Sequence, residues 1–210
     1  MSHRVFLLSP ASCAGRRCRL LLEPRAQFEL AVRMRGEGAP LGEVFSFLSS
    51  LYFRGKLAYA ERFASPPDAC PGVLVITPDR GLVGPDTTIG LDDLRAFARV
   101  PIDAREARYA EPLRRSASAL RARLPAASEI VLLGSIATPK YVDVLLDALG
   151  RSLLFPGAFV GRGDMSRGGL LLRAARAGAE LGYEPVDGAT RRGRRAAKLP
   201  PVRAARRTDR

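Results

Sequence analysis

The sequence predicts an α/β fold: a mostly parallel central sheet flanked by helices in a single domain, followed by a basic, disordered C-terminal tail. Apolar runs of strand length recur along the chain, and helical patterns lie between them. Apolar runs without polar alternation are typical of strands covered on both faces, and strands that alternate with helices indicate a parallel sheet. The chain has 210 residues, of which 47% are hydrophobic, so it can form one domain, which we place at residues 1–187.

Four apolar segments are the predicted strands, and turn residues bound each of them. They span residues 4–9, 72–77 and 129–134, and a last segment has two parts at 152–155 and 158–160. We expect these segments to form the buried centre of the sheet.

Helical patterns occupy the segments between the predicted strands. Residues 41–64 carry apolar side chains at helical spacing, and residues 91–98 begin a second helix. A third helix spans residues 109–124, with Pro112 in or near its first turn, where a missing N–H is tolerated. The clearest helix spans residues 138–150, because it starts with a threonine suited to an N-cap, continues with proline and ends at glycine.

The chain is basic throughout, with a formal net charge of +13. Residues 184–210 hold nine basic and three acidic residues, and residues 188–210 show no apolar pattern. We therefore predict a flexible tail at 188–210. Contact of this tail with nucleic acid and a merely solvated tail both fit the composition. The arginines expected on nucleic acid are Arg191, Arg192, Arg194 and Arg195.

Cysteine and histidine are scarce, which narrows the chemistry. The chain has three cysteines without CxxC spacing and a single histidine, His3. We therefore expect neither a metal site nor a nucleophile activated by histidine. No uncharged apolar run is long enough to span a membrane, so we expect no membrane partner and a cytoplasmic location. The composition does not identify a cofactor.

Polar loops follow each predicted strand. They are "SPASCAGRR", "TPDRGLVGPD", "GSIATPKY" and "GRGDMSRGG". In open α/β sheets, ligands bind beyond the carboxyl ends of the strands, so these four loops are the first candidates for a shared site.

The loop "GRGDMSRGG" precedes a predicted helix. With Asp164 as the N-cap, the free N–H groups of the first turn would bind an anion, and Arg162 and Arg167 would add forked donors. The two glycines that follow each cost about 1 kcal/mol of helix propensity relative to alanine. This cost favours close approach by another backbone or by a ligand, and helix–sheet packing through glycine is the alternative that needs no ligand.

Three residues are candidates for catalysis: Asp79, Lys140 and Asp164. Asp79 and the nearby Asp86 could each act as a general base or simply form a turn. Lys140 could bind phosphate, act as an amine base or nucleophile if desolvation lowered its pKa, or remain a solvated surface residue. The predicted ligand contacts lie in the same loops: Ser9, Ser12, Arg80, Gly81, Ser135, Tyr141, Arg162, Ser166 and Arg167.

Four short motifs occur in an order that resembles the YaaA-like peroxide-stress family and a related group of uncharacterised bacterial and phage domains. They are "LLSPA", "RGLVGPD", "GSIATPKY" and "GRGDMSRGG", and the region from residue 7 to residue 172 that they span covers most of the domain. Arg162, Met165, Ser166 and Arg167 are the strongest matches. Lys140 stands where an acid is common in that family, and we identify no helix-hairpin-helix segment, the element that the family is thought to use on DNA.

The resemblance implies a role near DNA or nucleotides, such as oxidative-stress protection or base modification. It favours a nucleic-acid-associated protein whose cleft binds a nucleotide or phosphate, with the tail on the polymer backbone. Two alternatives stay open. One is a small-molecule enzyme, such as a nucleoside or nucleotide N-glycosidase or transferase that acts through a carboxylate. The other is a non-catalytic interaction domain.

Overall fold

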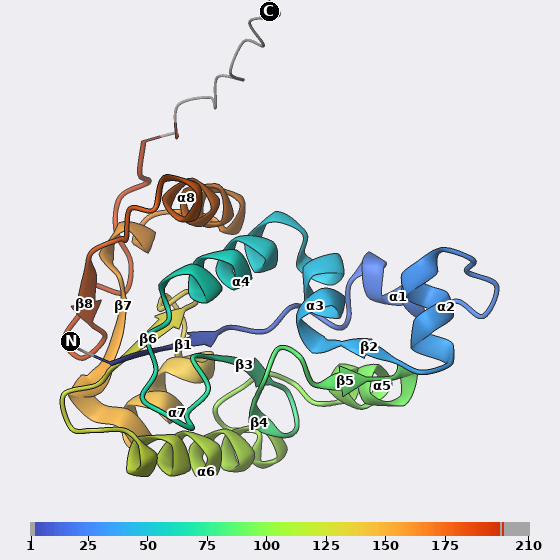
Figure 1. Ribbon diagram of the computed structural model, residues 1–210, viewed down its shortest axis with the longest axis horizontal. Helices are drawn as coiled ribbons and strands as arrows, with labels where there is room; N and C mark the ends of the chain where they lie inside the picture. The colour runs from blue at the N-terminus through green and yellow to red at the C-terminus, as the bar shows by residue number, and fades with distance from the viewer. Residues whose placement is uncertain (1–2, 198, 200–210) are drawn as a thin grey trace, which may run out of the picture.

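The computed structural model describes residues 3–197 and 199 (Figure 1). Its centre is a six-stranded sheet with the order β4-β3-β1-β6-β7-β8. The four middle strands are parallel, and they are β3 (Val73–Thr77), β1 (Arg4–Leu8), β6 (Glu129–Leu133) and β7 (Leu153–Pro156). Because these strands fall on the four predicted segments, the predicted α/β fold with a mostly parallel sheet is confirmed.

Two short antiparallel strands form the edges of the sheet. β4 (Gly81–Val83) pairs with β3, and β8 (Tyr183–Pro185) pairs with β7. Gly81 has a φ of +71°, and a Cβ on it would lie 2.4 Å from the carbonyl oxygen of Pro112. Glycine is therefore needed at position 81 for the turn and for contact with the neighbouring helix.

Helices cover both faces of the sheet (Figure 1). α6 (Ala107–Arg123) and α7 (Pro139–Leu149) cover one face. α3 (Leu41–Ser49) and α4 (Leu51–Phe63) cover the other face, and α8 (Asp164–Ala177) packs against α4. Each face therefore has its own apolar cluster.

The alternation of β1 links the two clusters. Phe6 and Leu8 belong to the cluster on the α4 side, whereas Val5 and Leu7 belong to the cluster on the α6 side. All four side chains are fully buried. A strand with both faces buried needs an apolar residue at every position, which explains why the run in the sequence is continuous.

A smaller lobe extends from the carboxyl ends of the strands (Figure 1). It contains α1 (Arg16–Leu22), α2 (Glu29–Arg35), α5 (Leu91–Arg99) and a two-stranded sheet of β2 (Ala39–Pro40) and β5 (Thr88–Ile89). The sequence predicts only α5 among these elements. The other two helices have seven residues each and no side-chain N-cap, so they lack the usual signals.

Three local predictions are wrong. The helix predicted over 41–64 is broken at Ser50, whose φ of +53° cannot continue an α-helix. Residues 158–160 form no strand, because Gly157–Phe159 is a 3-10 helix. Pro112 is an interior residue of α6, beyond the first turn.

The glycines at the start of α8 have different surroundings. A Cβ on Gly168 would lie 2.7 Å from the carbonyl oxygen of Leu51, and a Cβ on Gly55 would lie 2.7 Å from the carbonyl oxygen of Gly168. Gly169 meets only the side chain of Leu199, at 3.5 Å. Gly168 therefore permits the close approach of another backbone, that of α4, which is one of the two predicted reasons for a glycine here, whereas the alternative of helix–sheet packing is not what the structure shows at this residue.

Residues 188–197 form no helix or strand, as predicted for the tail, but they contact the domain. The N–H of Ala196 donates a hydrogen bond to the carbonyl of Gly161, 3.2 Å away. The rest of the predicted tail, residues 198 and 200–210, lies outside the described residues.

Candidate functional site

A cleft of about 760 Å³ opens at the carboxyl ends of β1, β3 and β6. Its walls are the loops after these strands, the starts of α7 and α8, and parts of α3, α4 and α5. In the sheet, β3 and β6 lie on opposite sides of β1. Open α/β sheets bind ligands where the strand order reverses in this way, and the volume is typical of a small-molecule site.

Arg167 brings a buried positive charge to the cleft. The residue is only 8% exposed. Its Nε and Nη2 atoms donate to the carbonyl of Phe159, each at 3.3 Å, and its Nη1 donates to the Asp164 carboxylate at 3.2 Å. These bonds hold the guanidinium in place and use three of its five N–H groups, so two are left for an anion.

Tyr141 connects the loops after β1 and β6. Its hydroxyl oxygen accepts a hydrogen bond from the N–H of Ser135 at 3.1 Å. A Cβ on Gly134 would lie 3.2 Å from this hydroxyl and 3.0 Å from the Cβ of Ser9, so glycine leaves the room for the contact. Burial raises the pKa of Tyr141, and its hydrogen bonds with Ser9 and Ser135 oppose that shift. The hydroxyl is therefore neutral and can donate a proton in a hydrogen bond.

Tyr52 of α4 carries a hydroxyl without a partner. Its oxygen is buried and forms no hydrogen bond within the described part of the chain, although the residue lines the cleft. Burial raises the pKa of Tyr52, and the nearby guanidinium of Arg167, whose contact with the hydroxyl falls short of hydrogen-bond geometry, opposes that shift. An unsatisfied buried hydroxyl costs about 1–3 kcal/mol, so a ligand atom that pairs with it would be favoured.

Lys56 of α4 lies beneath the cleft and is not among the predicted site residues. It is 1% exposed, and its Nζ donates to the Oγ of Ser9 at 3.0 Å and also to the carbonyl oxygen of Ser9. The Nζ lies 4.5 Å from the centroid of the Tyr52 ring. Burial lowers the pKa of Lys56 to about 7, and the charge of Asp164 opposes that shift.

The loop after β1 offers backbone donors to the cleft. Residues 11–14 line it directly. In the part of the chain that the structure describes, no acceptor pairs with the backbone N–H of any of these four residues. Ala11 and Cys13 are nevertheless buried, at 2% and 7% exposure, whereas Ser12 and Ala14 are exposed to solvent. Because buried N–H groups are nearly always paired, this loop is suited to an anionic ligand or to ordered water.

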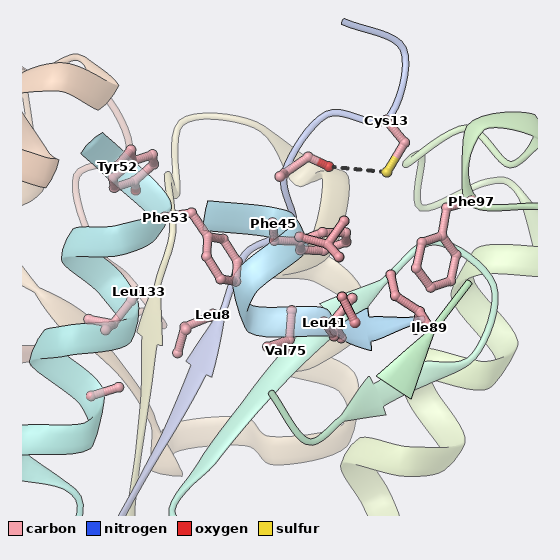
Figure 2. Packing of buried hydrophobic residues seen from close by; sticks show 14 of the residues in the cluster. Leu8, Cys13, Leu41, Phe45, Tyr52, Phe53, Val75, Ile89, Phe97 and Leu133 are labelled. Atoms are coloured by element: carbon pink, nitrogen blue, oxygen red, sulfur yellow. Dashed lines mark hydrogen bonds between the residues drawn. The ribbon is translucent and has the colours of Figure 1, made fainter. Parts of the chain in front are cut away.

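An apolar wall faces these polar groups. It is formed by side chains of α3, of α5 and of the segment after α5, namely Leu48, Phe97, Val100, Pro101 and Ile102. Figure 2 shows Phe97 beside Cys13 at the end of the apolar cluster, with Phe45 and Phe53 between them and Tyr52. The cleft thus combines a polar, positively charged side with an apolar side.

The structure brings together most of the predicted residues from three of the four loops. Those that line the cleft are Ser9, Ser12, Ser135, Lys140, Tyr141, Asp164 and Arg167. Thr138 is the N-cap of α7, as predicted. Asp164 is the first residue of α8 and not its N-cap, which is Gly163, so the carboxylate pairs with Arg167 instead of capping the helix.

The loop after β3 lies outside the cleft lining except at Pro78. Arg80 forms ion pairs with Asp79 at 2.8 Å and with Asp93 of α5 at 2.9 Å, and its guanidinium lies 4.7 Å from the centroid of the Phe97 ring. Gly81 begins β4. Asp79, Arg80 and Gly81 thus have structural surroundings, and none of the three lines the cleft.

Arg162 and Ser166 line a second cavity of about 590 Å³. The Nη1 of Arg162 donates to the Oγ of Ser166 at 3.2 Å and to the carbonyl of Ala197 at 3.1 Å. Arg195 and Ala196 also line this cavity, so residues of the predicted tail cover the start of α8. Asp164 lines both cavities, which therefore adjoin at this residue.

The four tail arginines are exposed. Arg191 forms an ion pair with Asp143 of α7 at 3.1 Å. Within the described residues, Arg192, Arg194 and Arg195 form no ion pair. Their charges are therefore available to an anionic partner.

Other types of site are not found in the part of the chain that the structure covers. The described residues contain no group of three or more His, Cys, Asp or Glu side chains that could hold a metal ion. None of the described helices is both long enough and apolar enough to cross a membrane. No family model, curated protein or solved structure matches the chain. The function must therefore be argued from the cleft itself.

Proposed function

We propose that the cleft binds a nucleotide or a nucleotide-like phosphate ester, and that the protein acts in association with nucleic acid. The observation that carries this proposal is the pairing of two walls in one cleft of about 760 Å³: a polar wall with Arg167, its ion-pair partner Asp164 and the exposed Lys140, and an apolar wall. A phosphate group fits the polar wall, and a nucleobase fits the apolar wall.

The phosphate side is built from rigid donors. Arg167 is held by Phe159 and Asp164 and keeps two N–H groups free. The unpaired amides of residues 11–14 and the first turn of α7, with Lys140, add further donors. Buried arginine and backbone amides at a helix start are the groups that bind phosphate in proteins.

The base side is apolar and partly aromatic. The aliphatic side chains of Leu48, Val100 and Ile102 offer a surface for a flat ring, and Phe97 is buried at the end of this wall. The hydroxyl of Tyr52 can pair with a polar atom of the ligand. Nucleotides are also the ligand class that the resemblance of the four motifs to the YaaA-like family implies.

Calorimetric titration tests the proposal. The ligands are purine and pyrimidine nucleoside monophosphates, the matching nucleosides and inorganic phosphate, each added to the full chain. We expect the nucleotides to bind more tightly than either part alone. Arg167→Met, which keeps the volume of the side chain but removes its charge, should weaken nucleotide binding by about tenfold to hundredfold.

Arg105→Ala is the matched control, because Arg105 is exposed, pairs with Asp103 and does not line the cleft. It should bind nucleotides like the wild type. If no nucleotide binds, or if Arg167→Met binds as tightly as Arg105→Ala, the proposed function is wrong.

The exposed arginines of the tail favour a polynucleotide as the larger partner. Arg195 reaches the cavity that adjoins the cleft at Asp164, so a strand with one nucleotide in the cleft could continue along the tail. Changing Arg192, Arg194 and Arg195 together to alanine should weaken binding of a short single-stranded DNA. The slope of log K against log salt should fall by about 2, since each lost phosphate contact reduces it by about 0.7. An unchanged slope would remove the tail from the proposal.

A further inference from the structure

We propose that Ser9 is a nucleophile in this cleft, that Lys56 is the base that activates it, and that the pair transfers the phosphoryl group of a bound phosphate ester. The inference rests on the proposed function in one respect, since it takes a phosphate ester as the ligand. The geometry of the pair does not depend on that function.

The two side chains are in direct contact. Nζ of Lys56 lies 3.0 Å from Oγ of Ser9, which is within reach for proton transfer. The Ser9 carbonyl accepts a second hydrogen bond from the same nitrogen, so the amine is held in place. Ser9 itself is the first residue after β1 and lines the cleft, at 5% exposure. The serine therefore faces the ligand while the lysine stays behind it.

The surroundings of Lys56 favour a neutral amine. Its Nζ lies 4.5 Å and 4.7 Å from the ring centroids of Tyr52 and Phe53, and no carboxylate forms an ion pair with it among the described residues. A neutral amine can donate one N–H to the Ser9 carbonyl and accept the Ser9 hydroxyl proton with its lone pair.

The charged groups around Lys56 are few. From α8, Asp164 and Arg167 carry opposite charges that pair with each other. The packed part of β3 has no titratable side chain, and Arg4 of β1 pairs with glutamates at the other end of the strand. On α3, Glu43 pairs with Arg33. From α7, Tyr141 reaches Ser9 and is neutral. No nearby group therefore supplies a strong unpaired charge that would keep Lys56 protonated.

The reaction step balances without a further reagent. Oγ of Ser9 attacks the phosphorus, its proton passes to Nζ of Lys56, and an Oγ–P bond forms. The P–O bond to the leaving group breaks, and the leaving oxygen takes a proton from water or from Lys140 at the mouth of the cleft. Lys56 then passes its proton through water to Lys140 or to the hydroxide that remains, so its amine is neutral again. Water attacks the phosphorus of the phosphoserine while Lys56 takes a proton from that water. The P–Oγ bond breaks, and Oγ of Ser9 takes the proton back from Lys56, which releases phosphate and free Ser9. Arg167 and the amides of residues 11–14 can stabilise the negative oxygens.

Diisopropyl fluorophosphate is a suitable probe, because it is a small phosphorus electrophile with fluoride as its leaving group. The full chain is incubated with it, the adduct is measured by intact-protein mass spectrometry, and the modified residue is located by peptide mapping. We expect one adduct on Ser9. Its rate should rise with pH around a midpoint near 7, where Lys56 loses its proton.

Three variants separate the roles. Ser9→Ala should lose the adduct. Lys56→Met and Lys56→Arg should slow labelling by at least about a hundredfold, since a general base contributes about 10² to 10⁴ and arginine keeps the charge and the hydrogen bonds but cannot accept a proton. Ser128→Ala is the control, because Ser128 is equally buried but precedes β6 at its amino end. It should label like the wild type.

The outcomes distinguish the two proposals. The Ser9–Lys56 pair is wrong if the wild type forms no adduct or forms it on another serine. It is also wrong if Lys56→Arg is labelled at the wild-type rate. If Lys56→Met fails to fold, a wild-type rate that does not change between about pH 6 and about pH 8.5 overturns it equally. If nucleotides bind but Ser9 is not labelled, the proposed binding function stands and the nucleophile is ruled out. If Ser9 is labelled but no nucleotide binds, the nucleophile stands and the proposed function is ruled out.

Discussion

Lys56 connects the chemistry of the cleft with the stability of the fold. Its pKa is about 7 in the folded protein and 10.5 in an unperturbed lysine, because burial disfavours the charged amine. Between these two values the folded protein binds fewer protons than the unfolded chain. The free energy of unfolding therefore rises with pH across this window, and the buried charge is destabilising at or below about pH 7.

We predict that Lys56→Met removes this pH dependence. The measured quantity is the free energy of unfolding of the variant minus that of the wild type. As pH falls from about 10 to about 7, this difference should rise by about 1.4 kcal/mol per pH unit, and it should stay constant below about pH 7. Denaturant titrations of both proteins at a series of pH values measure this difference. A difference that is independent of pH would show that Lys56 keeps its charge in the folded protein.

The buried thiol of Cys13 should be unreactive although it lines the cleft. Burial raises the pKa of Cys13 to about 12, with smaller contributions from Cys18 and Asp79, so almost no thiolate forms near neutral pH. We predict that iodoacetamide at about pH 8 modifies Cys70, which is partly exposed, well before Cys13 or Cys18. Peptide mapping after short exposure measures this order. Modification of Cys13 at the rate of Cys70 would make it a competing nucleophile in the cleft.

The residues of the site could be predicted only where a loop after a strand carries them. Ser9, Lys140 and Arg167 follow this pattern, and the structure brings all three to the cleft. Lys56 comes from the middle of a helix, so the rule could not find it. A signal was present, because Lys56 lies on the same helical stripe as Phe53 and Ala60, where a lysine is unusual. Arg80 was assigned to the site by the same rule, but the chain turns there into β4.

At the level of elements, the contact between α4 and α8 positions the site. α4 carries Tyr52 and Lys56, and α8 carries Arg167, so the spacing of these two helices sets how their side chains meet. Gly55 and Gly168 permit that spacing, since a Cβ on either would lie 2.7 Å from backbone of the other helix. A shift of either helix would therefore change how Tyr52 and Arg167 are placed at the cleft.

Gly168→Ala should therefore destabilise the protein by about 1–3 kcal/mol, because backbone atoms of α4 leave no room for the added methyl group. Gly169→Ala is the matched control one residue along the same helix, where the added Cβ meets only a side chain at 3.5 Å. It should be neutral or stabilise by up to about 1 kcal/mol, as expected for alanine in a helix. Thermal and denaturant unfolding of both variants test the contrast. Equal effects would mean that the helices are not in close contact.

The length of an element and the continuity of its apolar pattern decide how well the sequence predicts it. Every parallel strand is a continuous apolar run, and all four are found where expected. The edge strands β4 and β8 have three residues each, and α1 and α2 have seven, which is too short for a periodic pattern to stand out. The close packing of α4 on α8 depends on two glycines far apart in the sequence, which no local pattern connects.

On the scale of the whole molecule, the cleft and the tail are separate parts that meet at one residue. No residue of the described part of the tail lines the cleft. The tail contacts the domain at residues that do not line the cleft either, namely Asp143, Gly161 and Arg162. Asp164 lies where the two cavities adjoin. A ligand that occupies only the cleft should therefore be insensitive to the tail, whereas a polymer that extends from the cleft should depend on it.

We predict that a chain ending at Asp187 binds mononucleotides within about twofold of the full chain and binds single-stranded DNA more weakly. The loss for DNA should be largest at low salt, because the removed arginines act through phosphate charges that salt screens. Calorimetry with a mononucleotide and fluorescence anisotropy with a labelled oligonucleotide measure the two affinities, and thermal unfolding shows whether the shortened domain remains folded. A parallel loss of both affinities in a folded domain would mean that the tail forms part of the cleft. Unchanged affinity for both would place any nucleic acid on another surface of the domain.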